Sequence, residues 1–251
     1  MNQIFDININ VMDNVNLDII KDIEEKIRNS ESLNDNETFY FLSYVSYKVR
    51  DLLSKSKEKN LDEDDFKDGC NRAQAMLGYY FNDLGLKNIP VLTSKIFFNV
   101  VRHFFIIVYI VQNGELKAYI VDPTYNQFFN SDRCLDSNFV IKDGIIRNTP
   151  DPGYFILKKS LDEQDVIKNF LNFGFMELNS ENAKIYGDSF YFTQVGITEA
   201  EYENLFVPGN SYLKFFTMNP VELTKSEEEL KNEGLFFKPI DFKENNNIKS
   251  V

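Results

Sequence analysis

One β-hairpin constrains the fold of this chain more than any other feature of its sequence. Residues 100–111 are almost entirely apolar, residues 112–115 read Gln-Asn-Gly-Glu, and residues 116–121 are again mostly apolar. Asn-Gly is the pair most typical of a two-residue type I′ turn, because both turn positions need a positive φ. The sequence therefore predicts two antiparallel strands joined at Asn113 and Gly114.

The register of this hairpin brings two polar side chains together. With a two-residue turn, Phe105 faces Asp122 and His103 faces Thr124, so His103 and Asp122 are diagonal neighbours on one face. Diagonal neighbours lie roughly 7–8 Å apart at the backbone, within reach of a side-chain hydrogen bond. A histidine in an apolar strand needs a polar partner, and Asp122 is the one that the hairpin offers. This geometry depends on the turn, since a one-residue change in loop length would destroy it.

A helix that begins near Cys70 supplies a third functional group. Apolar residues recur there with the spacing of one buried helical stripe, at Ala73, Met76, Leu77, Tyr80, Phe81 and Leu84. Asp68 is the expected N-cap, and Gly85 is of the residue type that ends helices in the left-handed conformation. Cys70 then lies in the first turn, where free N–H groups and the helix dipole favour the thiolate over the thiol.

A cysteine at a helix start, a histidine on a strand and an aspartate on the next strand can divide the work of acyl transfer. Cys70 would attack a carbonyl carbon, His103 would take and return the proton, and Asp122 would fix the histidine tautomer. Backbone N–H groups at the helix N-terminus, including that of Cys70, would hold the oxyanion. His103 is the only histidine in the chain, and Cys70 is one of two cysteines.

The order of these residues resembles the core of the transglutaminase-like cysteine enzymes within the wider papain-like group. The resemblance rests on residues 69–73 (Gly-Cys-Asn-Arg-Ala), His103 and residues 121–124 (Val-Asp-Pro-Thr), and it extends from Cys70 to about Phe128. This group includes transglutaminases, bacterial effector and toxin deamidases, and some peptidases. The resemblance implies a nucleophile, a general base and acid, and an orienting residue, which are Cys70, His103 and Asp122 in that order.

Two departures from the family pattern concern the surroundings of the site. Phe104 and Phe105 follow the histidine where the family has a tryptophan. No Gln-x-x-x-x-x-Cys signature supplies an oxyanion donor, so that donor has no assigned side chain. The motif therefore indicates the superfamily more specifically than it indicates the reaction.

The implied reaction is acyl transfer through a thioester on Cys70, with an amide as acyl donor and water or an amine as acceptor. A protein or peptide is the implied substrate. Glutamine deamidation or transglutamination ranks first and peptide-bond cleavage second, and no cofactor is implied. A non-catalytic protein-binding module on the same fold is the alternative from another class, with Cys70 as a small buried side chain and the contact between His103 and Asp122 purely structural.

Composition excludes several other classes of function. The 251 residues carry a formal net charge of −12, which disfavours nucleic acid and anionic membrane surfaces as partners. No run of about 18 consecutive apolar residues predicts a membrane span. One histidine and two cysteines do not meet the three or four ligands of a zinc site, and no nucleotide-binding glycine loop is present. No metal site is predicted, although an all-carboxylate calcium or magnesium site, without EF-hand spacing, stays open in so acidic a chain.

Three further residues near the motifs are expected to play no catalytic role. Cys134 follows an arginine, but no second histidine is available to serve it, so it is expected to be an ordinary free thiol. Arg102 and Tyr125 flank the candidate site and are expected to pack or to face water. The N-terminal residues lack the pattern of a signal peptide, which predicts a cytoplasmic protein or export by a route without a classical signal.

The expected fold is α+β, with the Cys70 helix packed on an antiparallel sheet built around the hairpin and with helical additions at both ends. Two amphipathic helices are expected before the core as an antiparallel pair, one over residues 16–28 and one capped by Asn36. Later, a capping box at residues 160–163 predicts a helix that Gly174 ends. Further short helices are expected over residues 180–186 and 198–206.

The predicted organisation has four regions, with its main boundary at the Pro- and Gly-rich turn of residues 149–153. They are an N-terminal helical region (1–62), the Cys-His-Asp core (63–150), a C-terminal helical and mixed region (151–242) and a polar tail (243–251).

Overall fold

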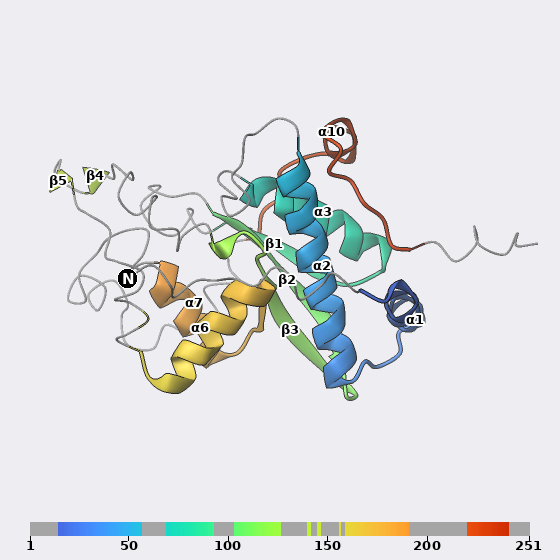
Figure 1. Cartoon of the computed structure of the whole chain (residues 1–251), viewed down its shortest axis with the longest axis horizontal. Helices are drawn as coiled ribbons and strands as arrows, with labels where there is room; N and C mark the ends of the chain where they lie inside the picture. The colour runs from blue at the N-terminus through green and yellow to red at the C-terminus, as the bar shows by residue number, and fades with distance from the viewer. Residues whose placement is uncertain are drawn as a thin grey trace, which may run out of the picture.

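The fold is known from a computed structural model, which describes residues 15–56, 69–92, 103–126, 140–141, 145–146, 156, 159–190 and 220–240. Within these residues the chain is α+β, with one four-stranded antiparallel sheet and helices around it (Figure 1). The α+β class predicted from the sequence is confirmed. No helix in the described part of the chain is long and apolar enough to cross a membrane.

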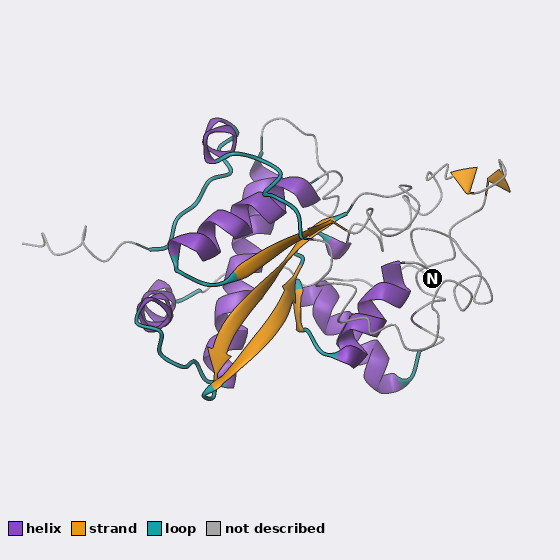
Figure 2. Ribbon diagram, turned by 180° about the vertical axis from the view of Figure 1, so that it is seen from behind, coloured by secondary structure: helices purple, strands orange, loops and turns teal. Residues whose placement is uncertain are grey.

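The central sheet has the strand order β1-β2-β3-β6, and each neighbouring pair is antiparallel. Its strands are β1 (Asn88–Leu92), β2 (Phe104–Gln112), β3 (Glu115–Val121) and β6 (Phe175–Glu177). Figure 2 shows this sheet from behind, with helices on either side of it. A separate two-stranded sheet joins β4 (Val140–Ile141) to β5 (Ile145–Ile146).

The hairpin of β2 and β3 has the register that its turn predicts. Gln112 pairs with Glu115 next to the turn, and Ile106 pairs with Val121 at the far end. Asn113 has a φ of 50° and Gly114 a φ of 83°, and positive values at both positions are the mark of a type I′ turn. The predicted register is therefore confirmed.

Alternate residues of β2 enter two different hydrophobic clusters, as expected for a sheet covered on both faces. Ile106, Val108 and Ile110 belong to a cluster with residues of α1 (Leu17–Arg28), α2 (Asp35–Lys55) and α3 (Cys70–Asp83). Phe105 and Ile107 belong to a second cluster with residues of α6 (Leu161–Phe173) and α7 (Ser180–Phe190). By the same alternation, residue 103 continues the face that α6 and α7 cover.

The first two helices differ in detail from the prediction. The second begins earlier than expected, because Asn34 rather than Asn36 is its N-cap and forms a capping box with Glu37. Phe39, an apolar residue of this helix, is 47% exposed and packs edge-on against Phe173 and Phe175. Figure 1 shows α1 end-on and α2 along its length, so the two helices cross and the predicted antiparallel pair is wrong.

The helix that carries Cys70 begins and ends close to the predicted positions. Cys70 is its first residue, so Gly69 is the N-cap in place of the expected Asp68, which lies outside the described residues. Gly69 has no side chain that could accept a hydrogen bond from a free N–H group, whereas Oδ1 of Asn71 accepts from the Arg72 N–H at 2.7 Å within the first turn. Gly85 follows the helix end with a φ of 77°, which confirms the predicted left-handed position.

The C-terminal half of the chain completes the sheet and covers its second face. Helix α6 opens with the predicted capping box of Ser160 and Glu163 and ends at Gly174, whose φ is 74°. Strand β6 follows and pairs with β3, and α7 confirms the helix predicted from residue 180. Residues 220–240 contain α10 (Glu227–Asn232) and bring Leu230 and Leu235 into the cluster around α3.

Several predictions fall on parts of the chain that the structure does not describe. These are the helix over residues 198–206, the boundary at residues 149–153, Arg102 and Cys134. The division into four regions stays a prediction.

Candidate active site

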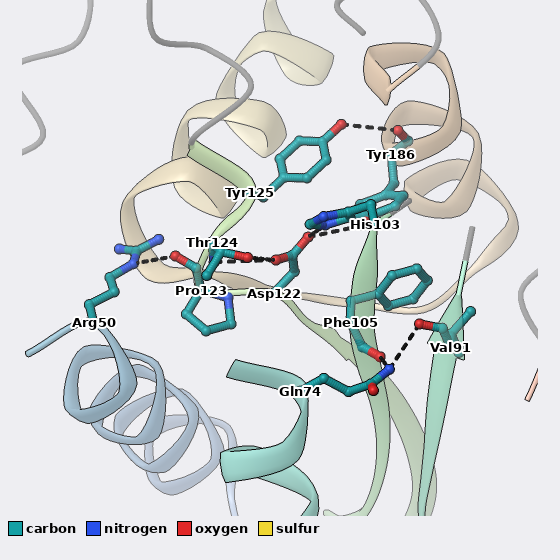
Figure 3. A network of polar contacts seen from close by, with 10 residues as sticks. All are labelled: Arg50, Gln74, Val91, His103, Phe105, Asp122, Pro123, Thr124, Tyr125 and Tyr186. Atoms are coloured by element: carbon teal, nitrogen blue, oxygen red, sulfur yellow. Dashed lines mark hydrogen bonds and ion pairs between the residues drawn. The ribbon is translucent and has the colours of Figure 1, made fainter. Parts of the chain in front are cut away.

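The open end of the hairpin brings His103 and Asp122 into contact. His103 precedes the first residue of β2, and Asp122 follows the last residue of β3. Their side chains meet at 2.5 Å between the imidazole Nε2 and the carboxylate Oδ2 (Figure 3). His103 is 0% and Asp122 1% exposed, so the pair is shielded from bulk water.

Both carboxylate oxygens of Asp122 accept hydrogen bonds. Oδ1 accepts from the backbone N–H of Thr124 at 3.2 Å and from its hydroxyl at 3.0 Å. Oδ2, the atom that contacts His103, also accepts from the Tyr186 hydroxyl at 2.9 Å. The backbone N–H of Asp122 donates to the carbonyl of Gly174 at 2.8 Å, which ties the aspartate to the end of α6. The orientation of this carboxylate is therefore set from three directions.

Cys70, the first residue of α3, interacts with the same imidazole and raises its pKa. Cys70 is buried, with 8% of its surface exposed. Because Asp122 binds Nε2, proton exchange between Cys70 and the ring must use Nδ1. All three candidate residues named from the sequence therefore lie together, and each of them is buried.

Opposing effects set the pKa of His103. Burial by itself lowers this pKa, since it disfavours the charged ring. The charge of Asp122, its hydrogen bond and the contact with Cys70 together outweigh burial and raise the pKa of His103 from 6.5 to about 9. The imidazolium form is therefore favoured at neutral pH, as a thiolate and imidazolium pair requires.

Gln74 attaches the helix of Cys70 to the strand of His103. It lies one helical turn after Cys70 and is fully buried. Its side-chain Nε2 donates to the carbonyls of Val91 and Phe105, at 3.0 Å each, which are register partners in β1 and β2 (Figure 3). Sequence reasoning missed this residue, although a polar residue on the buried side of an amphipathic helix was a usable signal.

Arg50 of α2 holds the segment that follows Asp122. Its guanidinium donates to the carbonyl of Pro123 at 2.7 Å and to those of Leu171 and Asn172, at 3.0 and 2.6 Å, in α6. Burial lowers the pKa of Arg50 to about 10, although the charge of Asp122 acts in the opposite direction. Nothing in the local sequence around Arg50 indicates this role, because its partners lie more than seventy residues away.

Aromatic rings line the site on the side of α6 and α7. Tyr125 is 1% exposed, and its ring stacks on that of Tyr186 with centroids 4.7 Å apart. The Tyr125 hydroxyl donates to the backbone carbonyl of Tyr186 at 3.2 Å. The imidazole of His103 lies 6.1 Å from the Tyr125 ring and 6.3 Å from that of Phe105. Tyr125 therefore packs, as expected, whereas the contact of Tyr186 with Asp122 was not foreseen.

The first turn of α3 is held from outside by residues 220–240. The Thr224 hydroxyl donates to the carbonyl of Asn71, the residue after Cys70. Arg72 pairs with Glu233 at 2.7 Å, and Lys225 pairs with the same carboxylate. A C-terminal segment thus braces the turn on which the thiol sits.

Comparison with known proteins finds no family model, no curated protein and no solved structure that matches this chain. Within the described residues, no group of three or more His, Cys, Asp and Glu side chains is placed to hold a metal ion. The papain-like resemblance and the catalytic roles of Cys70, His103 and Asp122 stay predictions, and the local geometry is what bears on them.

Proposed function

We propose that this chain is a cysteine-dependent acyl-transfer enzyme of transglutaminase-like or papain-like type. One observation carries the proposal: a single buried imidazole contacts a carboxylate through Nε2, and a cysteine at a helix start interacts with the same imidazole. In the proposed division of work, Cys70 is the nucleophile, His103 is the general base and acid, and Asp122 orients the ring.

The proposed reaction proceeds in two stages. The thiolate of Cys70 attacks the amide carbonyl, and His103 donates its proton to the departing nitrogen as the C–N bond breaks. This leaves a thioester on Cys70 and a neutral imidazole. His103 then takes a proton from water or an amine as that group attacks the thioester. The C–S bond breaks and releases Cys70 as the thiolate, which restores the thiolate and imidazolium pair.

The beginning of α3 is the proposed oxyanion site. Gly69 offers no capping side chain, and the Arg72 N–H donates to Oδ1 of Asn71 at 2.7 Å, so the N–H groups of Cys70 and Asn71 are the proposed oxyanion donors. The N–H of Cys70 is a natural donor, because the sulfur of the same residue attacks the carbonyl carbon. A negatively charged tetrahedral oxygen would also lie at the positive end of the helix dipole.

The proposed substrate is a glutamine side chain of a protein, and the resemblance of residues 69–73, His103 and residues 121–124 supports this choice. A primary amide releases ammonia in the first stage. Water in the second stage gives glutamate, and an amine gives a cross-linked or modified glutamine. Cleavage of a peptide bond uses the same residues and is the second candidate reaction.

Thiol reactivity tests the nucleophile. In a Cys134→Ser background, iodoacetamide can label only Cys70, and its rate is followed by intact mass at neutral pH. We expect labelling faster than that of a free peptide thiol, and slower labelling after His103→Ala or Asp122→Asn. Lys117→Ala, at the other end of the same hairpin, is the matched control and is expected to leave the rate unchanged. A wild-type rate no higher than that of the peptide would overturn the proposal in favour of a non-catalytic binding module.

Product mass distinguishes the two candidate reactions. Candidate protein substrates are incubated with the wild-type chain or with Cys70→Ala, and the released ammonia and the intact masses are measured. Ammonia release with a full-length product supports deamidation, and addition of a supplied amine supports transglutamination. Fragments formed only by the wild-type chain would replace this first choice with a peptidase.

A further inference from the structure

One carboxylate oxygen at the candidate site serves two donors from different elements. Oδ2 of Asp122 lies 2.5 Å from Nε2 of His103 and 2.9 Å from the hydroxyl of Tyr186. Oδ1 accepts only from Thr124 among the described residues. The Tyr186 hydroxyl therefore shares with the imidazole the oxygen on which the proposed triad depends.

We propose that Tyr186 is a positioning residue that moderates how strongly Asp122 favours the protonated form of His103. The inference rests on the proposed function only for its purpose, which is to keep the His103 proton transferable. The effect itself, a change in the pKa of His103, belongs to the resting protein. Tyr186 lies in α7, in the region that the sequence places outside the Cys-His-Asp core.

The hydroxyl of Tyr186 stays protonated and can donate to Asp122 at all working pH values. Burial, together with the charge of Asp122, raises the pKa of Tyr186 well above its ordinary value of 10, so the phenol keeps its proton over the working range. Its ring is held at fixed distances from its neighbours, 4.7 Å from Tyr125, 5.1 Å from Phe105 and 5.6 Å from Phe170. A hydroxyl so placed cannot turn away without moving the aromatic cluster.

A hydrogen bond to Oδ2 takes up part of the negative charge that acts on the imidazole. Among the described residues, Cys70 from α3, Arg50 from α2, and Tyr125 and Tyr186 from the second face of the sheet face the pair. Cys70 raises the pKa of His103, whereas each donor to the carboxylate reduces the pull of Asp122 on the same proton. Tyr186 is the donor on the oxygen that faces the ring, so its effect on His103 should be larger than that of Thr124.

This moderation matters because the proposed reaction moves the His103 proton twice. A carboxylate without the Tyr186 bond would hold the imidazolium more tightly. Protonation of the departing nitrogen would then be slower, and the neutral ring needed for the second stage would be rarer at neutral pH. Tyr186 would thus keep the proton of His103 transferable in a site that Asp122 and Cys70 bias toward the charged ring, against the effect of burial.

NMR titration of the only histidine in the chain tests this inference, because its imidazole signals need no assignment. In Tyr186→Phe we expect the pKa of His103 to rise above its wild-type value by about half a pH unit or more, since a hydrogen bond to a charged group is lost. Tyr125→Phe is the matched control. It removes a hydroxyl from the same cluster that bonds to a backbone carbonyl, and it is expected to leave this pKa unchanged.

A second variant tests the same hydrogen bond without removing the hydroxyl. Fluorotyrosine placed at position 186 alone makes the phenol a stronger donor and is expected to lower the pKa of His103. An unchanged or lower value in a folded Tyr186→Phe protein, or an unchanged or higher value with fluorotyrosine, would overturn the inference. Because the titration needs no activity, slow labelling of Cys70 would reject the proposed function while leaving this result standing.

Discussion

The charge of His103 should make the stability of this protein depend on pH in a stated direction. The pKa of His103 is about 9 in the folded chain, against an ordinary value of 6.5. The difference of about 2.5 pH units, at about 1.36 kcal/mol for each, corresponds to about 3 kcal/mol of folding free energy. His103 is 0% exposed, so solvent screening does not reduce this figure in the way it does for surface pairs.

The sign follows from which state binds the proton more tightly. A pKa that is raised on folding means that the folded chain keeps the proton over a range in which the unfolded chain releases it. The stabilisation is therefore complete below pH 6.5 and is lost as the pH rises through about 9. We expect the free energy of unfolding of the wild-type chain to fall by about 3 kcal/mol across this window from His103 alone.

Urea unfolding at pH values on both sides of this window measures the effect. His103→Gln should remove the corresponding part of the slope, and the difference between the two proteins isolates it from other titrating groups. Asp122→Asn should lower the pKa of His103 well below its wild-type value, because burial remains while the charge and the charged hydrogen bond of Asp122 are gone. Equal slopes in the wild type and in His103→Gln, or an unchanged His103 titration in Asp122→Asn, would refute the reasoning.

Two further predictions concern stability away from the imidazole. Gly174→Ala should cost about 2–3 kcal/mol or more, because a Cβ there would lie 2.9 Å from the Pro123 Cα at a positive φ; Gly85→Ala, with a similar φ and open space, should cost only about 1 kcal/mol. Equal shifts in their denaturation midpoints would contradict this. Burial raises the pKa of Glu24 above 4.5, against its bond from Tyr80, so stability should fall as the pH rises through that pKa. Glu24→Gln should remove this slope in the same urea series, and a persisting slope would assign it to other groups.

The parts of the site that were predictable from the sequence depend on short-range rules. The Asn-Gly turn determines the register of β2 and β3, and the register places His103 next to Asp122. The periodicity after Cys70 shows which side of α3 is buried, and Gly85 marks its end. Each of these rules connects residues that are close in the chain or paired through one turn.

The residues that sequence reasoning missed act across long separations. Arg50 reaches the carbonyl of Pro123, 73 residues away, and Tyr186 reaches Asp122, 64 residues away. Propensity and periodicity describe each element alone, and neither states where a side chain will meet another element. Gln74 is a partial exception, because a glutamine on a buried helical side must find hydrogen-bond partners, even though its partners could not be named.

The anchoring of Asp122 shows why the C-terminal helices belong to the candidate site. Asp122 comes after the last ladder residue of β3, so the hairpin alone does not hold its backbone. The carbonyl of Gly174 accepts its N–H at 2.8 Å, and Gly174 can approach so closely only because it lacks a Cβ. Arg50 then ties the next residue to the end of the same helix. The contact that orients His103 therefore depends on how α6 docks on the sheet, and a substitution that loosens this docking should disturb the imidazole without touching Cys70.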